Sequence, residues 1–347
     1  MRKTRIPQIF GTLLVVGTLV GFPATNGQQS TPPSGETQNQ SEHQDQSLET
    51  LQVNVNVVQL FFNVRDKKGG ALIPDLARDN FEILEDGKPQ TIKYFAAESN
   101  LPLTLGILID SSGSQERVLK MEKEVGGEFL NEILRDKDLA FVISFDVNVN
   151  LLHDFTNSVD ALKAALNKAR IDINGGRTTG TPGPGGNVPV VLRGTLLYDA
   201  VYLASNDELS QQVGRKAVIL LTDGEDQGSQ MRITDAIEAA QKSGSIIYVL
   251  LCADGRFYGS GEYSGKGKMK KLTEETGGRV IVVGNKFNKL KNAFNQIANE
   301  LRSQYNIGYT PTNTVLDGTL RKVEIHARNK DYRIQARTAY YALPTRN

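Results

Sequence analysis

Five uninterrupted apolar runs constrain the fold of this chain more than any other feature of its sequence. They begin at Leu103, Leu139, Lys216, Ser245 and Arg279, and they read "LTLGILID", "LAFVISF", "KAVILLT", "SIIYVLLC" and "RVIVV". Apolar runs without alternation are typical of strands that helices cover on both faces. They predict an α/β fold with a doubly wound, mostly parallel sheet over residues 99–301.

Segments of helical periodicity lie between these runs. A helix that packs on a sheet repeats apolar residues three or four positions apart, and three such sets are present: Val118, Val125, Phe129 and Ile133; Val159, Leu162, Leu166 and Ala169; Ile233, Ile237 and Ala240. A further helix is expected over about 285–303. The alternating segment "VNVNLLHDF" follows the second run too closely for a crossover connection, so it predicts an antiparallel strand at the edge of the sheet.

Both flanks of this region alternate apolar and polar residues, as half-buried antiparallel strands do. On the N-terminal side, Val53, Val55 and Val57 alternate with asparagines, and "DNFEILEDGKPQTIKYF" contains the hairpin signal Asp86-Gly87. On the C-terminal side, "QYNIGYT", "RKVEIHAR" and "YRIQARTAYYA" alternate in the same way. Neither flank has enough strands for a domain. We therefore predict one discontinuous β-sandwich, residues 51–98 plus 302–343, into which the α/β domain is inserted.

The N-terminus has the layout of a secretory signal peptide. A cationic start, "MRKTR", precedes the apolar "IPQIFGTLLVVGTLVGF" and a small, polar segment, which predicts cleavage between about Ala24 and Gly27. A retained membrane anchor is the alternative, because the apolar segment is nearly long enough to span a bilayer. Residues 28–50 are polar and lack aromatic side chains, so we expect a disordered linker. The protein is thus expected to be exported to the periplasm, the cell surface or the medium.

The charge balance and the cysteine content exclude some classes of function. The formal net charge of +1 becomes −2 when the three basic residues of a signal peptide are removed, so no basic surface indicates nucleic acid. Membrane contact is expected only through an uncleaved N-terminal segment. Cys252 is the only cysteine and lies within an apolar run, so no intrachain disulfide can form and a buried thiol is predicted.

Oxygen-bearing side chains follow the ends of two predicted parallel strands. Asp110 ends the run from Leu103 and precedes Ser112 and Ser114, while Asp223 follows the run from Lys216. Ligands bind open parallel sheets beyond the carboxyl ends of the strands, so these side chains are expected at one edge. Thr195, just before a predicted helix, offers a further hydroxyl from a third loop. All of these donors are hard oxygens, which suit one Mg²⁺, Mn²⁺ or Ca²⁺ ion.

Simpler interpretations of the same residues remain open. Ser112 or Ser114 would also be suitable as a helix cap, and Asp223-Gly224 would be suitable as a turn. The long Gly/Pro/Thr-rich stretch before Thr195 offers competing hydroxyls, at Thr178, Thr179 and Thr181. We expect this loop, residues 174–192, to influence which partner binds.

These motifs resemble the metal-ion-dependent adhesion site of von Willebrand factor type A domains. The resemblance covers about residues 100–301 and rests on Asp110-x-Ser112-x-Ser114, Thr195 before a helix, and Asp223 within Thr-Asp-Gly. It implies that Ser112, Ser114 and Thr195 ligate the ion directly, whereas Asp110 and Asp223 act mainly through water. The flanks resemble an exported bacterial group, the acidobacterial VWFA-related domain proteins.

The resemblance and the donor chemistry together predict a metal-dependent protein-binding module rather than an enzyme. The expected partner is a protein that presents an Asp or Glu carboxylate to the ion, as in an adhesion or scaffold protein. A metal-assisted hydrolase is the first alternative, although its general base is not evident, because His43, His153 and His326 fall outside the predicted site. A module whose metal is purely structural is the second. "GSGEYSGKGK" lacks the spacing of a Walker motif, so its lysines, from Lys266 to Lys271, predict a solvated helix face.

Overall fold

The structure is a computed structural model that describes residues 57–97, 101–171, 194–252 and 264–344. The predicted signal peptide, linker and partner-selecting loop 174–192 lie outside these ranges, as do Val53 and Val55. All of the described residues belong to one compact unit. None of the helices in the described part is both long and apolar enough to cross a membrane.

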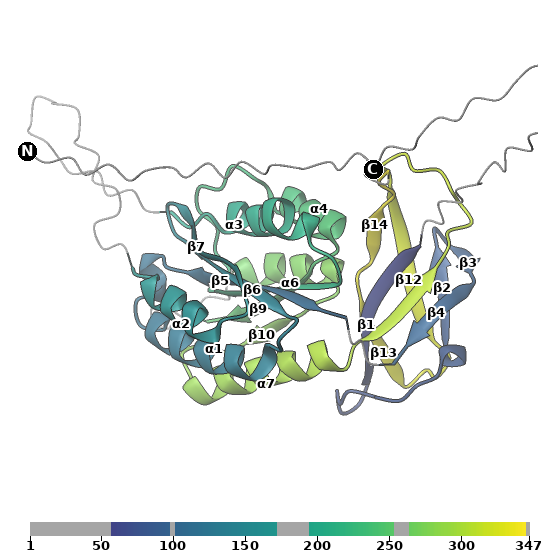
Figure 1. Cartoon of the computed structure of the whole chain (residues 1–347), viewed down its shortest axis with the longest axis horizontal. Helices are drawn as coiled ribbons and strands as arrows, with labels where there is room; N and C mark the ends of the chain where they lie inside the picture. Colours follow the sequence, from purple (N-terminus) through teal and green to yellow (C-terminus); the bar gives the residue numbers. More distant parts are fainter. Residues whose placement is uncertain (1–56, 98–100, 172–193, 253–263, 345–347) are drawn as a thin grey trace, which may run out of the picture. The chain divides into compact units, whose positions relative to one another are not determined.

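A six-stranded sheet forms the centre of the α/β region (Figure 1). Its order is β10-β9-β8-β5-β6-β7, and all neighbours are parallel except β7, which pairs antiparallel with β6 at the edge as predicted. The strands, in chain order, are β5 (Leu103–Asp110), β6 (Leu139–Phe145), β7 (Val149–Thr156), β8 (Arg215–Thr222), β9 (Ile246–Leu251) and β10 (Val280–Val282). The predicted fold class is confirmed for this sheet.

Helices cover the sheet on both faces, which accounts for the unbroken apolar runs. Alternate residues of one strand enter different cores: Ile107 packs with α1, α2 and α7, whereas Leu108 packs with α3, α4 and α6 (Figure 1). The helices are α1 (Leu119–Ile133), α2 (Val159–Lys168), α3 (Leu197–Leu203), α4 (Ile233–Ser243), α6 (Ser264–Thr276) and α7 (Phe287–Arg302). The run from Arg279 differs from the expectation, because β10 is an edge strand and leaves Val282 51% exposed.

Two four-stranded antiparallel sheets form the sandwich, and each contains strands from both ends of the described chain. One sheet has the order β13-β1-β11-β4 and the other β14-β12-β2-β3 (Figure 1). The strands are β1 (Val58–Asp66), β2 (Phe81–Glu85), β3 (Lys88–Gln90), β4 (Ile92–Ala96), β11 (Tyr305–Tyr309), β12 (Leu320–Ala327), β13 (Tyr332–Ala336) and β14 (Ala339–Tyr341). Early and late residues share one core, which contains Phe62, Ile83, Ile307 and Val323. The predicted insertion into a discontinuous sandwich is thus observed, while the boundaries at 51, 99 and 302 stay a prediction.

One local feature of the sandwich follows from the sequence, and another does not. Asp86 and Gly87 have φ values of 47° and 76° in the β2–β3 turn, the left-handed conformation expected of this hairpin signal. The segment "YRIQARTAYYA" forms two strands, β13 and β14, which belong to different sheets. Between them Thr338 donates to Glu275 of α6, with 2.7 Å between Oγ1 and Oε2, so a contact with the α/β region interrupts the predicted strand.

A buried carboxylate joins the sandwich to the α/β region. Glu300 on α7 is fully buried, and its Oε1 lies 2.6 Å from Arg65 Nη2 of β1 and 2.8 Å from Arg279 Nε. Its Oε2 accepts a hydrogen bond from Gln335 of β13 at 3.1 Å, and its backbone carbonyl accepts one from Asn63. These contacts connect both sandwich halves to the last helix.

Candidate metal centre

Asp110 ends β5, where the backbone is adjacent to the end of β8. Parallel pairing of Ile109 with Leu221 places Asp110 beside Thr222, and Thr222 Oγ1 donates to Asp110 Oδ2 at 2.7 Å. The backbone N–H of Ser112 donates to the other carboxylate oxygen at 2.9 Å. Asp110 is completely buried. Two donors therefore fix its carboxylate beneath the rim of the sheet.

The hydroxyls of Ser112 and Ser114 face one another on the loop after β5. Their Oγ atoms are 3.1 Å apart, and Ser114 Oγ donates to Asp223 Oδ2 at 2.5 Å. Neither hydroxyl caps a helix: Ser112 precedes the short 3₁₀ turn Gly113–Gln115 without a side-chain cap, and Val118 is the residue that precedes α1. The capping alternative therefore does not account for these serines.

Asp223 lies on the turn after β8 and faces the serine loop. Its Oδ2 accepts hydrogen bonds from Ser114 and from Gln115 Nε2, the latter at 3.0 Å, while Oδ1 accepts the backbone N–H of Glu225 at 3.1 Å. Gly224 has φ +87°, which a residue with a side chain rarely adopts. The turn interpretation is thus correct, but the Asp223 side chain also contacts the serine loop directly.

Thr195 lies at the same rim but is held there by its backbone. It forms an antiparallel bridge with Gln227, with N–H···O distances of 2.9 and 3.0 Å, and the next residue, Leu196, donates to the carbonyl of Asp146. Thr195 is buried, and within the described ranges no hydrogen bond joins it to the four residues above. Thr178, Thr179 and Thr181 lie outside the described residues. The structure therefore brings Asp110, Ser112, Ser114 and Asp223 into one network and places Thr195 on a neighbouring loop.

Electrostatics of the rim favour a cation. Burial, followed by the nearby charge of Asp223, raises the pKa of Asp110 from 3.8 to about 7, and the hydrogen bonds from Ser112 and Thr222 oppose the rise. Burial likewise raises the pKa of Glu122 on α1 to about 8, and the charges of Asp110 and Asp223 add to the rise. Acidic groups this close together in a low-dielectric site repel one another when ionised, and a divalent ion relieves that repulsion. The residues present therefore fit a hard cation.

Several residues of this region were not predicted from the sequence. Ser111 donates to the Phe145 carbonyl and to Asp146, so it turns away from the network. Gln115 and Thr222 complete the hydrogen bonds around the two aspartates, and no local pattern distinguished them. The burial of Glu122 could have been predicted from the sequence, because it lies four residues after Val118 and three before Val125, on the apolar face of α1.

Acidic neighbours of Asp223 have other roles. Asp226 Oδ1 accepts the backbone N–H of Tyr198 at 3.2 Å and the hydroxyl of Ser229 at 2.5 Å, close to the start of α3. Glu225 Oε1 accepts the N–H of Gly265 at 2.9 Å. Across the described part of the chain, no three His, Cys, Asp or Glu side chains form a metal-binding group.

The remaining predictions about single residues are met by the structure. Cys252 is fully buried, as expected for a structural thiol. The lysines of α6 are exposed, as expected for a solvated face. His153 lies on the edge strand β7 and bonds to the Asp154 carbonyl, while His326 on β12 contacts Glu324.

Comparison with known proteins gives structural neighbours only. No protein-family model and no curated protein matches the chain. Similar solved structures include proximal thread matrix protein 1 from the mussel byssus, with 15% identity, a TM-score of 0.46, and coverage of 63% of this chain and 51% of that one. A further structure of that protein, described as having a zinc-occupied MIDAS motif, has 16% identity, a TM-score of 0.46, and coverage of 63% and 50%.

A von Willebrand factor type A protein from Catenulispora acidiphila is also similar, with 14% identity, a TM-score of 0.43, and coverage of 84% of this chain and 73% of that one. The match to the mussel protein spans about half of that protein's length. At these identities and TM-scores, the function of this chain has to be argued from its own side chains.

Proposed function

We propose that this chain is an exported, metal-dependent protein-binding module of the adhesion or scaffold type. It holds one divalent cation, Mg²⁺, Mn²⁺ or Ca²⁺, at the rim of the central sheet, and there it captures a carboxylate of a partner protein. The residues that we propose to hold the ion are Asp110, Ser112, Ser114, Thr195 and Asp223.

The observation that carries this proposal is the hydrogen-bonded series that links Ser112, Ser114 and Asp223 beside the buried carboxylate of Asp110. The two serine hydroxyls and the Asp223 carboxylate bring several oxygen atoms close together. Each hydroxyl supplies only one proton and an ionised carboxylate supplies none, so some oxygen lone pairs face one another without a hydrogen-bond donor. Such a cluster is a poor arrangement for stability alone, since the two aspartates repel each other. It is a suitable arrangement for a hard cation, which oxygen ligands coordinate.

The donor set also indicates how the site would meet a partner. Hydroxyl ligands are neutral, so Ser112, Ser114 and Thr195 leave most of the positive charge of an ion uncompensated. The carboxylate of Asp110 is tied to Thr222 Oγ1 and to the Ser112 N–H, which limits its freedom to approach the ion directly. A bound cation of this kind supplies an electrophilic position at which an incoming Asp or Glu carboxylate can replace water.

The position of these residues supports binding at the surface rather than in an enclosed cavity. Ser114 is only partly buried and follows an exposed glycine, Gly113, so the loop after β5 meets solvent. Asp110 and Asp223 lie just beneath it and are buried. A partner could therefore reach the hydroxyl layer without any opening of the fold.

Capture of partners from the cell envelope fraction tests the proposal. The immobilised protein is expected to retain partners with Mg²⁺ or Mn²⁺, to release them in chelator, and to lose them in Ser114→Ala. Ser111→Ala is the matched control, because Ser111 lies on the same loop and bonds to Asp146 instead. Prior amidation of the partners' carboxylates should abolish capture.

Two outcomes would contradict the proposal. Equal capture with and without chelator would mean that a bound metal has only a structural role and does not contact the partner. Turnover of a substrate that depends on Ser114 and on the ion would support the metal-assisted hydrolase instead.

A further inference from the structure

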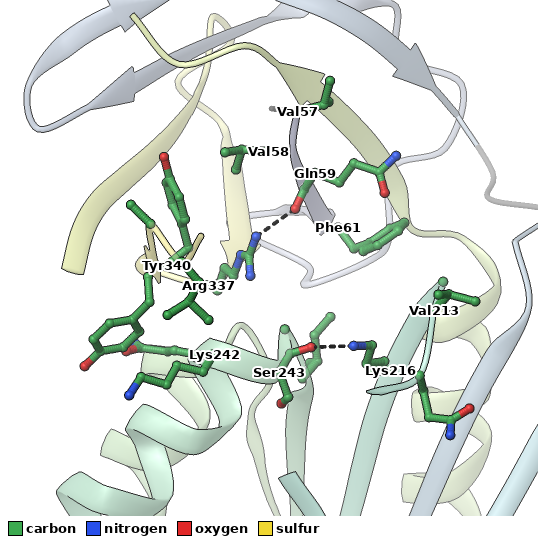
Figure 2. A pocket seen from close by; sticks show the side chains of 18 residues that line it. Val57, Val58, Gln59, Phe61, Val213, Lys216, Lys242, Ser243, Arg337 and Tyr340 are labelled. Carbon is green, nitrogen blue, oxygen red and sulfur yellow. Dashed lines mark hydrogen bonds between the residues drawn. The ribbon is translucent and has the colours of Figure 1, made fainter. Parts of the chain in front are cut away.

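A cavity of about 490 Å³ lies at the end of the central sheet opposite the candidate metal centre. Figure 2 shows its walls, with Val58, Gln59 and Arg337 on the sandwich side and Lys216 and Ser243 on the α/β side. Lys216 is the second residue of β8, and Asp223 directly follows the last residue of that strand. At about 3.3 Å per residue, the two sites are roughly 23 Å apart along the strand.

The cavity lining is positively charged. It includes Lys216, Lys242 and Arg337, and the described lining residues include no Asp or Glu. Lys242 is already paired with Glu238, at 2.6 Å between Nζ and Oε1. Lys216 donates to the Ser243 carbonyl and Arg337 to the Gln59 carbonyl, each at 2.8 Å (Figure 2). Carbonyl acceptors are neutral, so the charges of Lys216 and Arg337 are not cancelled.

The surroundings disfavour the charged form of Lys216. Burial, and then the charge of Arg337, lowers the pKa of Lys216 from 10.5 to about 8, and burial lowers the pKa of Arg337 as well. Each of these side chains retains N–H groups beyond the one used on its carbonyl, since an ammonium has three and a guanidinium five. An anion placed between them would accept those donors and reduce the repulsion.

The rest of the lining mixes polar and apolar side chains, with Gln59, Gln212, Gln241 and Ser243 among the polar ones. Val58, Phe61, Ile246 and Leu343 contribute hydrocarbon surface, and Tyr340 contributes an aromatic ring. A volume of this size is within the range of small-molecule sites, about 300–1,000 Å³. An inorganic anion alone would leave this apolar surface in contact with water.

We propose that this cavity binds a small organic anion, with its charged group between Lys216 and Arg337 and its apolar body against Val58, Phe61 and Leu343. The ligand is a carboxylate or another oxyanion with a short hydrocarbon portion. The site is separate from the proposed metal centre and needs no metal.

Calorimetric titration of the purified full chain with octanoate tests the proposal, with octanamide and inorganic phosphate as the two comparison ligands. Octanoate should bind, whereas octanamide lacks the charge and phosphate lacks the apolar body, so both should bind at least about tenfold more weakly. Lys216→Met should weaken octanoate binding by about tenfold or more, because a charge-assisted hydrogen bond is lost. Lys216→Arg should keep most of the affinity, and Lys289→Met, an exposed lysine on α7, should keep all of it.

Lys216 also donates to the carbonyl at the end of α4, so its replacement could weaken the fold as well as the site. The melting temperature of each variant, measured without ligand, shows whether the variant is folded. If Lys216→Met does not fold, Arg337→Met gives the same test from the sandwich wall. Absence of octanoate binding, equal binding of octanamide, equal binding of phosphate, or unchanged affinity in the folded variants would each overturn the proposal.

Discussion

Ser114 Oγ donates a hydrogen bond to Asp223 Oδ2 at 2.5 Å, although 109 residues separate them in the sequence. The contact forms because β5 and β8 are parallel neighbours, so the loops that follow them leave the sheet at the same edge. It joins the serine loop to the second aspartate through a direct contact between side chains. The proposed metal centre is thus largely assembled by the fold itself.

Ser114→Ala is expected to lower the affinity for Mn²⁺ or Mg²⁺ by at least about tenfold, since one oxygen ligand out of about six is removed. The fold should survive, because Ser114 is only partly buried. Calorimetric titration measures the affinity, and thermal melting confirms the fold. Ser111→Ala should leave the affinity unchanged. Equal affinity in Ser114→Ala and in the wild type would show that the ion, if bound, is held elsewhere.

Asp110→Asn and Ser112→Ala should also lower the affinity for the cation by at least about tenfold. Asparagine is preferred to alanine at position 110, because Asp110 is fully buried and its removal would leave Thr222 Oγ1 and the Ser112 N–H without their acceptor. Unchanged affinity in both variants, by the same titration, would be incompatible with the proposed residues.

Glu122→Gln is expected to stabilise the protein at alkaline pH when chelator is present. The pKa of Glu122 is about 8 in the folded protein, against an ordinary value of 4.5. Between these values the folded state retains a proton that the unfolded chain has released, so stability falls as the pH rises from 5 to 8. A hydrogen bond from the nearby Cys252 thiol opposes the rise in the pKa of Glu122 but offsets only part of it.

The gain in unfolding free energy should be on the order of a few kcal/mol at pH 8 and small at pH 5, measured by denaturant unfolding. Some decline with pH should remain in the variant, because the pKa of Asp110 is also raised. Glu124→Gln, an exposed carboxylate on the same helix, should show no such gain. A parallel pH profile for Glu122→Gln and the wild type would contradict the prediction.

Glu300→Gln is expected to destabilise the protein by about 3 kcal/mol, because it removes the charge that Arg65 and Arg279 share. The value is at the lower end for a broken buried pair, since both arginines keep some contact with water. Glu128→Gln is the matched control on α1: its pair with Lys291 is about half exposed, so the cost should be less than about 1 kcal/mol. Equal losses in the two variants would show that Glu300 does not hold the sandwich to α7.

Arg321→Leu should cost about 3–5 kcal/mol, whereas Lys322→Leu should cost about 1 kcal/mol or less. Arg321 is almost fully buried, pairs with Glu85 of β2 at 3.3 Å, and also donates to the Asn313 carbonyl. Tyr309 and Tyr340 donate to the same Glu85 carboxylate. Lys322 points to the opposite, solvent-exposed face and pairs there with Glu324. Denaturant unfolding of the two variants measures the difference, and similar midpoints would contradict a structural role for the buried pair.

The sequence by itself determined the class of fold. Side-chain periodicity is a local property: continuous apolar runs report strands covered on two faces, and alternation reports strands covered on one. Alternation together with a short connection predicted the edge strand β7, and the Asp86-Gly87 dipeptide predicted the hairpin between β2 and β3. The continuous runs also placed Asp110 and Asp223 at one rim, because parallel strands of one sheet end on the same side.

Only the tertiary structure decided which charged residues are buried and what they contact. Glu122 and Arg321 occupy inward positions of a helix and a strand. A charged group in such a position needs a partner or a shifted pKa, and the neighbouring sequence predicts neither. The partner of Arg321 is 236 residues away. The cavity between Lys216 and Arg337 likewise exists only because the last strands return to β1 and the start of β8. The local pattern determines on which face of a helix or strand a side chain lies. Long-range packing determines which charges and hydrogen-bond partners surround it there.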